Sequence, residues 1–430
     1  MVEQFREMTR QFVAGPDFQR AVVAAERDPY AAPTAFLRRC AELGLLGLDV
    51  PDEYGGGLLG PVEQAAVLEE LARGHAGLAL AVLVQNSLTA YPIRRFGTAE
   101  QQRAYLPRMA RGELFAAFGL SEPLHGSDAK GIELTATRDA ARGGWRLNGT
   151  KRWITNADRA GLVVLAARTG APESRGRGIT VFLVEIGPDV PGFSVPKPYD
   201  KIGQAGSTLC EPVFDDVFAP DGAILGALDG GWEIVNSTLE HSRVWIAAQG
   251  SGIALGALDE AERYTAERVQ FGQRLADIPA VADHLAVLRR QVALARFLVA
   301  KAARHEAAGD PLCFVWASLA KLIAGETALW TAADAMLLHG GIGYVEEMPI
   351  ARIYRDAAVL RIYEGAAHIQ VKIVERYLDR DKIAALFPPT AALMVDPAAL
   401  TPLAALTAEI ESWQPRALAA EERDTAVARR

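Results

Sequence analysis

Cysteine is scarce in this chain, and its distribution excludes most kinds of cross-link. Among 430 residues the only cysteines are Cys40, Cys210 and Cys313, which lie far apart and form no CxxC pair. An odd, scattered set argues against a disulfide framework and against a cysteine-based zinc site. The seven histidines form no HExxH motif and no other pair at metal-ligand spacing, so we predict no bound metal. We expect a reducing, cytoplasmic location.

Basic charge and long apolar runs are also lacking. The chain has 45 basic and 53 acidic residues, for a net charge of −8, whereas a general nucleic-acid binder normally has a basic surface. The longest apolar run, residues 76–84, is too short to span a bilayer, and the first twelve residues lack the apolar core of a signal peptide. We therefore expect neither a nucleic acid nor a membrane as a partner.

What is present indicates an α+β protein in three domains. Residues 1–117 are rich in Ala and Leu and predict an N-terminal all-α domain. Residues 118–225 contain short β-rich runs separated by turn residues, which predicts an antiparallel β-barrel or sandwich. Residues 226–380 return to helical periodicity and predict a C-terminal four-helix bundle, and residues 381–430 form a tail with one amphipathic helix. One apolar stripe of the bundle consists of Val281, Leu285, Leu288, Val292, Ala295 and Val299.

Two segments of the β region have residues suited to a flat, anionic ligand. In FGLSEPLHGSD, residues 118–128, Pro123 and Gly126 predict a tight turn whose backbone N–H groups and serines can hold anionic oxygens. In NGTKRWITN, residues 148–156, Asn-Gly predicts a hairpin, after which Trp153 and Thr155 point to one face of a strand. An ordinary polar loop and a Trp packed on a sheet surface are the alternatives.

Two segments of the C-terminal region each place a charged residue where it could bind a ligand or act as a base. In YTAERVQFGQ, residues 264–273, Arg268 and Phe271 lie one helical turn apart, so a fixed cation and an aromatic ring share a face. In LRIYEGAAHIQ, residues 360–370, Glu364 lies in an apolar stretch, where desolvation would raise its pKa towards that of a general base. A solvated Arg at a helix end and a surface Glu at a helix boundary are the alternatives.

The order and spacing of these segments resemble the acyl-CoA dehydrogenase family over about residues 10–380. Further matches are GLLGLDVPDEYGG, FGTAEQQRAYLPRMARGE, HGGIGY and IARIYRDA. The family has an N-terminal helical domain, a middle β domain and a C-terminal helical bundle. The resemblance implies an FAD-dependent α,β-dehydrogenation of an acyl thioester, in which a carboxylate takes the α-proton and flavin N5 accepts the β-hydride.

The resemblance also assigns residues. Glu364 corresponds to the base, and Ser242, the position at which other members carry it, cannot do that job. Thr155 corresponds to the hydroxyl near flavin N5, and Arg268 and Phe271 correspond to residues that reach the FAD of a neighbouring subunit. The implied FAD contacts are Phe118, Leu120, Ser121, Gly126, Ser127, Trp153, Ile154, Thr155, Arg268, Phe271, Leu337, Gly340, Gly341, Ala366 and His368. The implied thioester and pantetheine contacts are Ser127, Glu240, Arg243, Tyr363 and Gly365.

Some positions depart from the family pattern. Leu337, Ala366 and His368 replace residues that hydrogen-bond FAD across a subunit interface, which predicts weaker FAD binding. Pro279 replaces a frequent Gln, and Leu124-His125 replaces a pair of small residues. At the family's acyl-pocket floor, Val84-Gln85-Asn86 predicts a short or polar acyl group.

Several partners and alternatives follow from the resemblance. We expect a homo-oligomer, a tetramer or a dimer, with an electron acceptor such as an electron-transfer flavoprotein. The substrate is acyl-CoA or a thioester on an acyl carrier protein. The alternatives are an oxidase or monooxygenase on the same fold, and a relative that has lost tight FAD binding.

Overall fold

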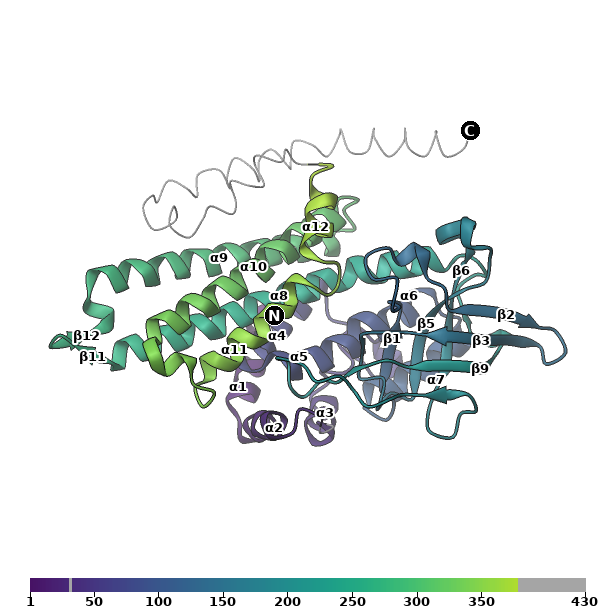
Figure 1. Cartoon of the computed structure of the whole chain (residues 1–430), viewed down its shortest axis with the longest axis horizontal. Coiled ribbons are helices and arrows are strands. Elements are labelled where there is room, and N and C mark those ends of the chain that lie inside the picture. The colour runs from purple at the N-terminus through teal and green to yellow at the C-terminus, as the bar shows by residue number, and fades with distance from the viewer. Residues whose placement is uncertain (31–32, 378–430) are drawn as a thin grey trace. The chain divides into compact units, whose positions relative to one another are not determined.

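The computed structural model (Figure 1) describes residues 1–30 and 33–377, which form two compact units. Unit 1 comprises Met1–Trp245, and unit 2 begins at Ile246, inside one long helix. The predicted tail, residues 381–430, lies outside the described residues. Helices, then a β-sheet, then helices follow one another along the chain, which confirms the α+β prediction.

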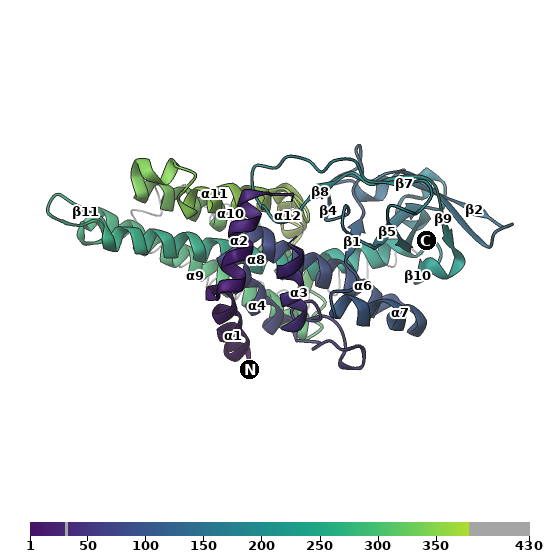
Figure 2. The same cartoon turned by 90° about the horizontal axis from the view of Figure 1, so that it is seen from below.

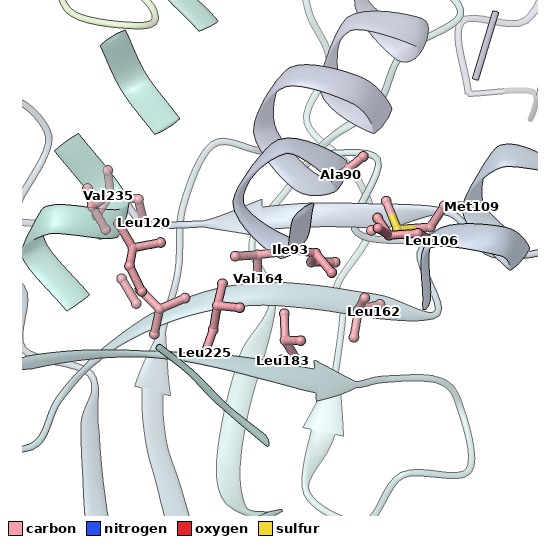
Figure 3. Close-up of a cluster of buried hydrophobic side chains, with 14 of the residues drawn as sticks. Ala90, Ile93, Leu106, Met109, Leu120, Leu162, Val164, Leu183, Leu225 and Val235 are labelled. Atoms are coloured by element: carbon pink, nitrogen blue, oxygen red, sulfur yellow. The ribbon is translucent and has the colours of Figure 1, made fainter. Parts of the chain in front are cut away.

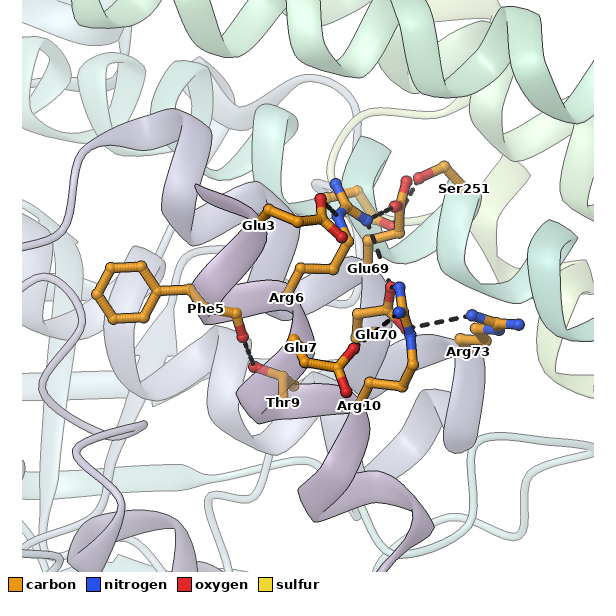
Figure 4. Close-up of polar contacts among 11 residues, drawn as sticks. Glu3, Phe5, Arg6, Glu7, Thr9, Arg10, Glu69, Glu70, Arg73 and Ser251 are labelled. Atoms are coloured by element: carbon orange, nitrogen blue, oxygen red, sulfur yellow. Dashed lines mark hydrogen bonds and ion pairs between the residues drawn. The ribbon is translucent and has the colours of Figure 1, made fainter. Parts of the chain in front are cut away.

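The N-terminal part of unit 1 is helical. Its helices are α1 (Val2–Ala14), α2 (Pro16–Arg27), α3 (Thr34–Glu42), α4 (Pro61–Gly74), α5 (Ala76–Leu83), the π-helix η2 (Val84–Ala90), α6 (Tyr91–Phe96) and α7 (Ala99–Ala110). Arg10 on α1 lies 2.9 Å from the buried Glu70 on α4, and Arg6 pairs with Glu69 beside it (Figure 4). These ion pairs attach the first helix to α4.

One helical run in unit 1 is longer than the apolar stretch in its sequence. Ala76–Phe96 is long and apolar enough to cross a membrane, with a mean hydropathy of 1.3, but 94% of its apolar window is buried inside the protein. The uninterrupted apolar run in the sequence, residues 76–84, is shorter because the polar residues Gln85, Asn86 and Ser87 follow it. Those side chains are buried and bond backbone carbonyls, so the helix continues as a core element.

The sheet of unit 1 has eight strands in the order β10-β6-β5-β2-β3-β9-β7, with β1 also paired to β5. The strands are β1 (Ala116–Gly119), β2 (Thr135–Asp139), β3 (Gly144–Thr150), β5 (Leu162–Arg168), β6 (Ile179–Glu185), β7 (Phe193–Ser194), β9 (Val213–Pro220) and β10 (Ile224–Leu225). A separate pair consists of β4 (Ile154–Thr155) and β8 (Leu209–Cys210). The pairing is antiparallel except where β1 and β2 meet β5.

The predicted hairpin at Asn148-Gly149 is wrong. Both residues lie within β3, where the register with β9 shifts between Leu147 and Gly149. The side-chain oxygen of Asn148 accepts the N–H of Asp216 at 2.9 Å across this irregularity. Asn-Gly therefore forms a bulge here, while residues 140–143 make the turn between β2 and β3.

A shared core joins the sheet to the helices of unit 1. Figure 3 shows Ile93 of α6 and Leu106 and Met109 of α7 against the sheet. Their sheet partners include Leu162, Val164, Leu183 and Leu225, all of which are buried. Each such side chain contributes about 1.5–3 kcal/mol by leaving water. This packing holds the end of β1, from which residues 120–128, the first of the segments predicted to contact the cofactor, continue.

Unit 2 is a helical bundle. Its helices are the C-terminal part of α8 (Gly231–Glu267), α9 (Pro279–Ala307), α10 (Cys313–His339), α11 (Pro349–Ala357) and α12 (Ala367–Val374), with the hairpin β11 (Val269–Gln270) and β12 (Gln273–Arg274). Helices α9 and α10 run side by side in both views (Figures 1 and 2). The predicted stripe on α9 is confirmed from Leu285 onward, because Leu285, Leu288, Val292, Ala295 and Val299 are buried, whereas Val281 on the first turn is only half-buried.

Candidate active site

The first candidate cofactor segment is a tight turn that follows β1. The N–H of Glu122 donates to His125 O at 3.0 Å, and the N–H of His125 donates back to Glu122 O at 3.2 Å. Leu120 is buried before the turn, whereas Gly126 and Ser127 are exposed after it. The predicted turn is confirmed. Its exposed side carries the groups that can meet a ligand.

A buried ion pair anchors this turn. The Nζ of Lys151, fully buried, lies 2.7 Å from Glu122 Oε1 and 2.9 Å from Leu120 O. The Glu122 carboxylate also accepts the N–H of Glu133 at 2.5 Å and of Leu134 at 2.9 Å. Burial lowers the pKa of Lys151 to about 8, against the attraction of Glu122. Sequence reasoning missed this pair, because its members are 29 positions apart and no local pattern connects them.

The second candidate segment adjoins the first. Arg152 N donates to Ser121 O at 2.9 Å, so the two segments predicted to contact a flavin meet within unit 1. Trp153 is 51% exposed, and its ring centroid lies 5.1 Å from that of Tyr199. The structure therefore places a half-exposed indole beside the turn, as an aromatic ligand would require.

The predicted strand through Trp153 is only partly correct. Strand β4 contains just Ile154 and Thr155, and Trp153 has a left-handed φ of 67°. Ile154 is buried in the domain core and Thr155 is half-buried. The orientation of Trp153 therefore comes from a backbone corner, a conformation that costs about 1–3 kcal/mol for a non-glycine residue.

Two of the predicted substrate residues of unit 1 lie on α8, and the third, Ser127, lies after the turn that follows β1. Glu240 and Arg243 are three residues apart, so they share a face of the helix. Glu240 Oε1 accepts the side-chain N–H of Asn236 at 2.8 Å, and Arg243 is buried. Ser242 is fully buried and its hydroxyl donates to Leu239 O at 3.3 Å.

A buried polar cluster beside these residues was missed by sequence reasoning. The Nε2 of His241 lies 2.9 Å from Asp49, which is also 2.7 Å from Arg94. Tyr91 stacks on the His241 ring at 4.0 Å and bonds Ser237 Oγ at 2.9 Å. Spacing along the chain gave no signal, because Asp49, Arg94 and His241 come from three distant segments. The cluster attaches α8 to α6 next to Arg243.

The structure also changes the interpretation of the predicted pocket floor. Gln85 donates to Leu114 O at 2.8 Å and accepts the N–H of Ala116 at 3.1 Å. Asn86 donates to Leu45 O and Val82 O, both at 2.9 Å. Both amides are buried and bonded to the backbone, so they give no reason to expect a polar acyl group.

Glu364 lies in a turn of unit 2 between the short helix η8 (Ala358–Arg361) and α12. Its φ is 51° and that of Gly365 is 87°, so two consecutive residues are left-handed. Glu364 is half-buried and Ile362 before it is 68% exposed, so the apolar stretch around Glu364 is not fully buried. A strained non-glycine residue of this kind persists only where its surroundings hold it, and such residues gather at functional sites.

Four contacts hold this turn. Lys321 Nζ donates to Gly365 O at 2.7 Å, and Gln370 Nε2 donates to Gly365 O at 2.9 Å and to Glu364 O at 3.2 Å. The hydroxyl of Tyr363, the predicted substrate contact before Glu364, donates to Gln249 Oε1. The turn is thereby connected to α8, α10 and α12.

The helical face predicted for Arg268 and Phe271 is wrong. Helix α8 ends at Glu267, and Phe271 lies at the tip of the β11–β12 hairpin with a φ of 52° and 91% of its side chain exposed. The period of YTAERVQFG continues past the end of the helix, so periodicity alone could not locate this end. Both residues are nevertheless exposed, as an intermolecular contact requires.

The other predicted FAD contacts of unit 2 are also at its surface. Leu337 is 68% exposed on the last turn of α10, and Gly340 and Gly341 follow it, both exposed. Tyr264 stacks on His339 at 4.3 Å, so the ends of α8 and α10 meet. Ala366 is the N-cap of α12 and His368 is exposed on its first turn. In residues 1–30 and 33–377, no group of three His, Cys, Asp or Glu residues is placed to hold a metal ion.

Comparison with known proteins assigns the family. Three family profiles match in order: "Acyl-CoA dehydrogenase, N-terminal domain" over residues 2–113, "middle domain" over 117–217 and "C-terminal domain" over 229–378. The chain therefore belongs to the acyl-CoA dehydrogenase family. It is an enzyme of the acyl-CoA dehydrogenase type, an oxidoreductase that acts on the CH–CH group of an acyl thioester.

Individual relatives agree with this assignment. The acryloyl-CoA reductase (NADH) of Anaerotignum propionicum is 35% identical over 375 residues, which cover 87% of this chain and 93% of the relative. The butyryl-CoA dehydrogenase structure from Megasphaera elsdenii has a TM-score of 0.82 at 34% identity and covers 87% and 97% of the two chains. The prolyl acyl carrier protein oxidase AnaB has a TM-score of 0.80 at 27% identity and covers 88% and 98%.

Proposed function

We propose that this enzyme binds FAD and that Glu364 is the base that takes the α-proton of its acyl thioester. The observation that carries the proposal is the turn at Glu364, where the backbone of an acidic residue is held in a left-handed conformation by hydrogen bonds between the turn and side chains of three helices. Strain maintained in this way is typical of a side chain whose position matters for chemistry.

The residues of unit 1 fit FAD. Trp153 offers a half-exposed indole for a flat heteroaromatic ring, and Thr155 offers a hydroxyl two residues later. The adjacent turn presents Gly126 and Ser127 on its exposed side, where backbone N–H groups suit anionic oxygens. When bound, FAD would supply the two-electron acceptor for the β-hydride. Phe118, Leu120, Ser121 and Ile154 would support these contacts from the turn and the strand.

Glu364 needs help to remove an α-proton, because such a proton is too weakly acidic for a free carboxylate. We propose that the backbone N–H of Glu364 donates to the thioester oxygen as enolate charge develops, which typically contributes about 3 kcal/mol per donor. A turn that fixes both the carboxylate and this N–H can orient both groups on one substrate. The resemblance assigns contacts with the thioester and pantetheine to Ser127, Glu240 and Arg243 of unit 1 and to Tyr363 and Gly365 of unit 2.

The acyl carrier is coenzyme A in our proposal, with an acyl carrier protein as the second candidate. The names of the relatives support both, since one acts on butyryl-CoA and another on a prolyl group carried by an acyl carrier protein. The test compares each acyl group on CoA and on a phosphopantetheinylated carrier protein, with an artificial electron acceptor. A much higher kcat/KM on the carrier protein would overturn the CoA proposal.

The same assay tests the direction of electron flow. A high yield of hydrogen peroxide without the acceptor would identify an oxidase. Oxidation of NADH with an enoyl thioester, supported by the name of the Anaerotignum relative, would identify a reductase. We propose the dehydrogenase direction, with an electron-transfer flavoprotein as acceptor and a cytoplasmic location, because the resemblance and the scarcity of cysteine favour them.

We also propose a homotetramer built as a dimer of dimers. Unit 2 exposes large apolar side chains near the ends of α8 and α10, where Tyr264 meets His339: Val269, Phe271, Leu337, Ile342 and Tyr344. Apolar patches of this kind mark interaction sites. Arg268 and Phe271 would complete a neighbour's FAD site, so FAD should dissociate on dilution to monomers. A chain that is monomeric by light scattering and retains FAD fully would contradict this.

A further inference from the structure

Lys321 is an unusual residue for its place in the fold. It lies in the middle of α10, between apolar neighbours, and only 2% of its surface is exposed. Lysine is almost never fully buried unless its ammonium group is paired. One partner is the carbonyl oxygen of Gly365, 2.7 Å from Nζ. The buried ammonium group of Lys321 therefore donates to the backbone of Gly365, the residue that follows Glu364.

The turn around Glu364 depends on such contacts for its shape. Glu364 and Gly365 are both left-handed, a conformation that a non-glycine residue avoids without support. A Cβ at position 365 would approach Gln370 Nε2 to 2.3 Å, so glycine allows Gln370 to reach the same carbonyl as Lys321. The Gly365 carbonyl therefore receives two donors, both from buried side chains.

A second attachment holds the other end of the turn to the same helix. Arg361 Nε lies 2.8 Å from Glu326 Oε1, and Glu326 is five residues after Lys321 on α10. This pair is half-exposed, so it contributes less than a buried, charge-assisted bond. Helix α10 thus holds the turn before and after Glu364, and Lys321 makes the stronger of the two attachments.

We propose that Lys321 is a positioning residue for Glu364: its ammonium group fixes the Gly365 carbonyl and so sets the position of the Glu364 carboxylate and backbone N–H. The inference rests on the proposed role of Glu364 as the base. A misplacement of about 1 Å at a reacting group can cost about a hundredfold in rate. Loss of Lys321 should therefore slow proton removal while substrate binding changes little.

The test uses the FAD-loaded enzyme with Lys321→Met, which keeps the length of the side chain and removes the donor. We expect kcat to fall about tenfold to a hundredfold, KM to stay within about threefold, and the primary isotope effect with an α-deuterated thioester to rise. Amide hydrogen exchange in residues 358–370 should accelerate. The control is Leu322→Ala, the next buried residue on α10, which should lower stability without changing the isotope effect.

A second variant keeps the inference testable if Lys321→Met does not fold. Gln370→Leu removes the other donor to Gly365 O and should show the same pattern with a smaller loss. Unchanged hydrogen exchange in residues 358–370, or an unchanged isotope effect, in a folded Lys321→Met protein would overturn the inference. If exchange is faster in Lys321→Met but Glu364→Gln remains active, the role of Glu364 as the base is wrong. Lys321 would then still hold the turn, so the two failures can be told apart.

Discussion

Replacement of Lys151 by Met tests whether the buried ion pair holds the first cofactor segment. The substitution leaves the Glu122 carboxylate buried without its ammonium partner, a change that typically costs about 3–5 kcal/mol. Glu122 retains two backbone donors, the N–H groups of Glu133 and Leu134. We therefore expect the lower end of that range, about 3 kcal/mol, in the free energy of unfolding of unit 1.

The assay is urea unfolding of apo-protein, followed by Trp fluorescence, with a matched control. Arg138→Met breaks the pair between Arg138 and Asp221, in which both side chains are about half exposed, and should cost less than about 1 kcal/mol. Adding Glu122→Met to Lys151→Met should recover part of the loss, because no charge then stays buried, although the N–H groups of Glu133 and Leu134 lose their acceptor. If Lys151→Met costs no more than Arg138→Met, the buried pair does not hold this segment.

Two further predictions concern FAD and pH. Leu337→Gln together with Ala366→Thr should tighten FAD binding about tenfold to a hundredfold, since each added hydrogen bond contributes about 0.5–1.5 kcal/mol. The measurement is flavin fluorescence quenching on titration of apo-protein with FAD. Equal affinity of the double variant and wild type would show that other residues hold the distal part of FAD. In the folded protein the pKa of Lys151 is about 8, against an ordinary value of 10.5. Between these two pH values the unfolded chain carries a proton on Lys151 that the folded protein lacks, so Lys151 makes the free energy of unfolding rise with pH. The stability of wild type relative to Lys151→Met, measured by urea unfolding at several pH values in this window, should increase with pH, and a flat difference would contradict the lowered pKa.

Much of the fold could be predicted because its signals are periodic or local. The stripe on α9 is confirmed because seven-residue spacing places those side chains on one face whatever the partner helix is. The turn after β1 is confirmed because Pro123 restricts its own backbone locally. Neither feature depends on residues that are distant in the sequence.

The errors come from features that the surrounding structure decides. Asn148-Gly149 forms a bulge instead of a hairpin because β3 continues its pairing with β9. Arg268 and Phe271 leave the helix because the chain turns into a hairpin after Glu267. In the first case pairing with the distant strand β9 overrode a local preference, and in the second a local hairpin replaced the further helical turn that the periodicity had predicted.

The contacts that hold the candidate site were not readable from sequence. Glu364 was found by its surroundings in the chain, but the side chains that hold its turn come from other elements: Lys321 of α10 donates to Gly365 O, and Gln249 of α8 accepts from the Tyr363 hydroxyl. Lys151 and Glu122 are likewise 29 positions apart. Sequence reasoning identified groups suited to the chemistry, and only the structure shows which side chains hold them in place.

The most direct test of the central claim is anaerobic mixing of FAD-loaded Glu364→Gln with the acyl thioester for which wild type has the highest kcat/KM, followed by the loss of oxidised-flavin absorbance. Gln is nearly isosteric with Glu and cannot accept the proton, so we expect intact fold and FAD content. Flavin reduction should slow by more than the roughly 10²–10⁴-fold typical of a lost general base, since Ser242, at the alternative position, cannot take the proton. A variant that reduces its flavin at about a tenth of the wild-type rate would contradict the assignment of Glu364 as the base.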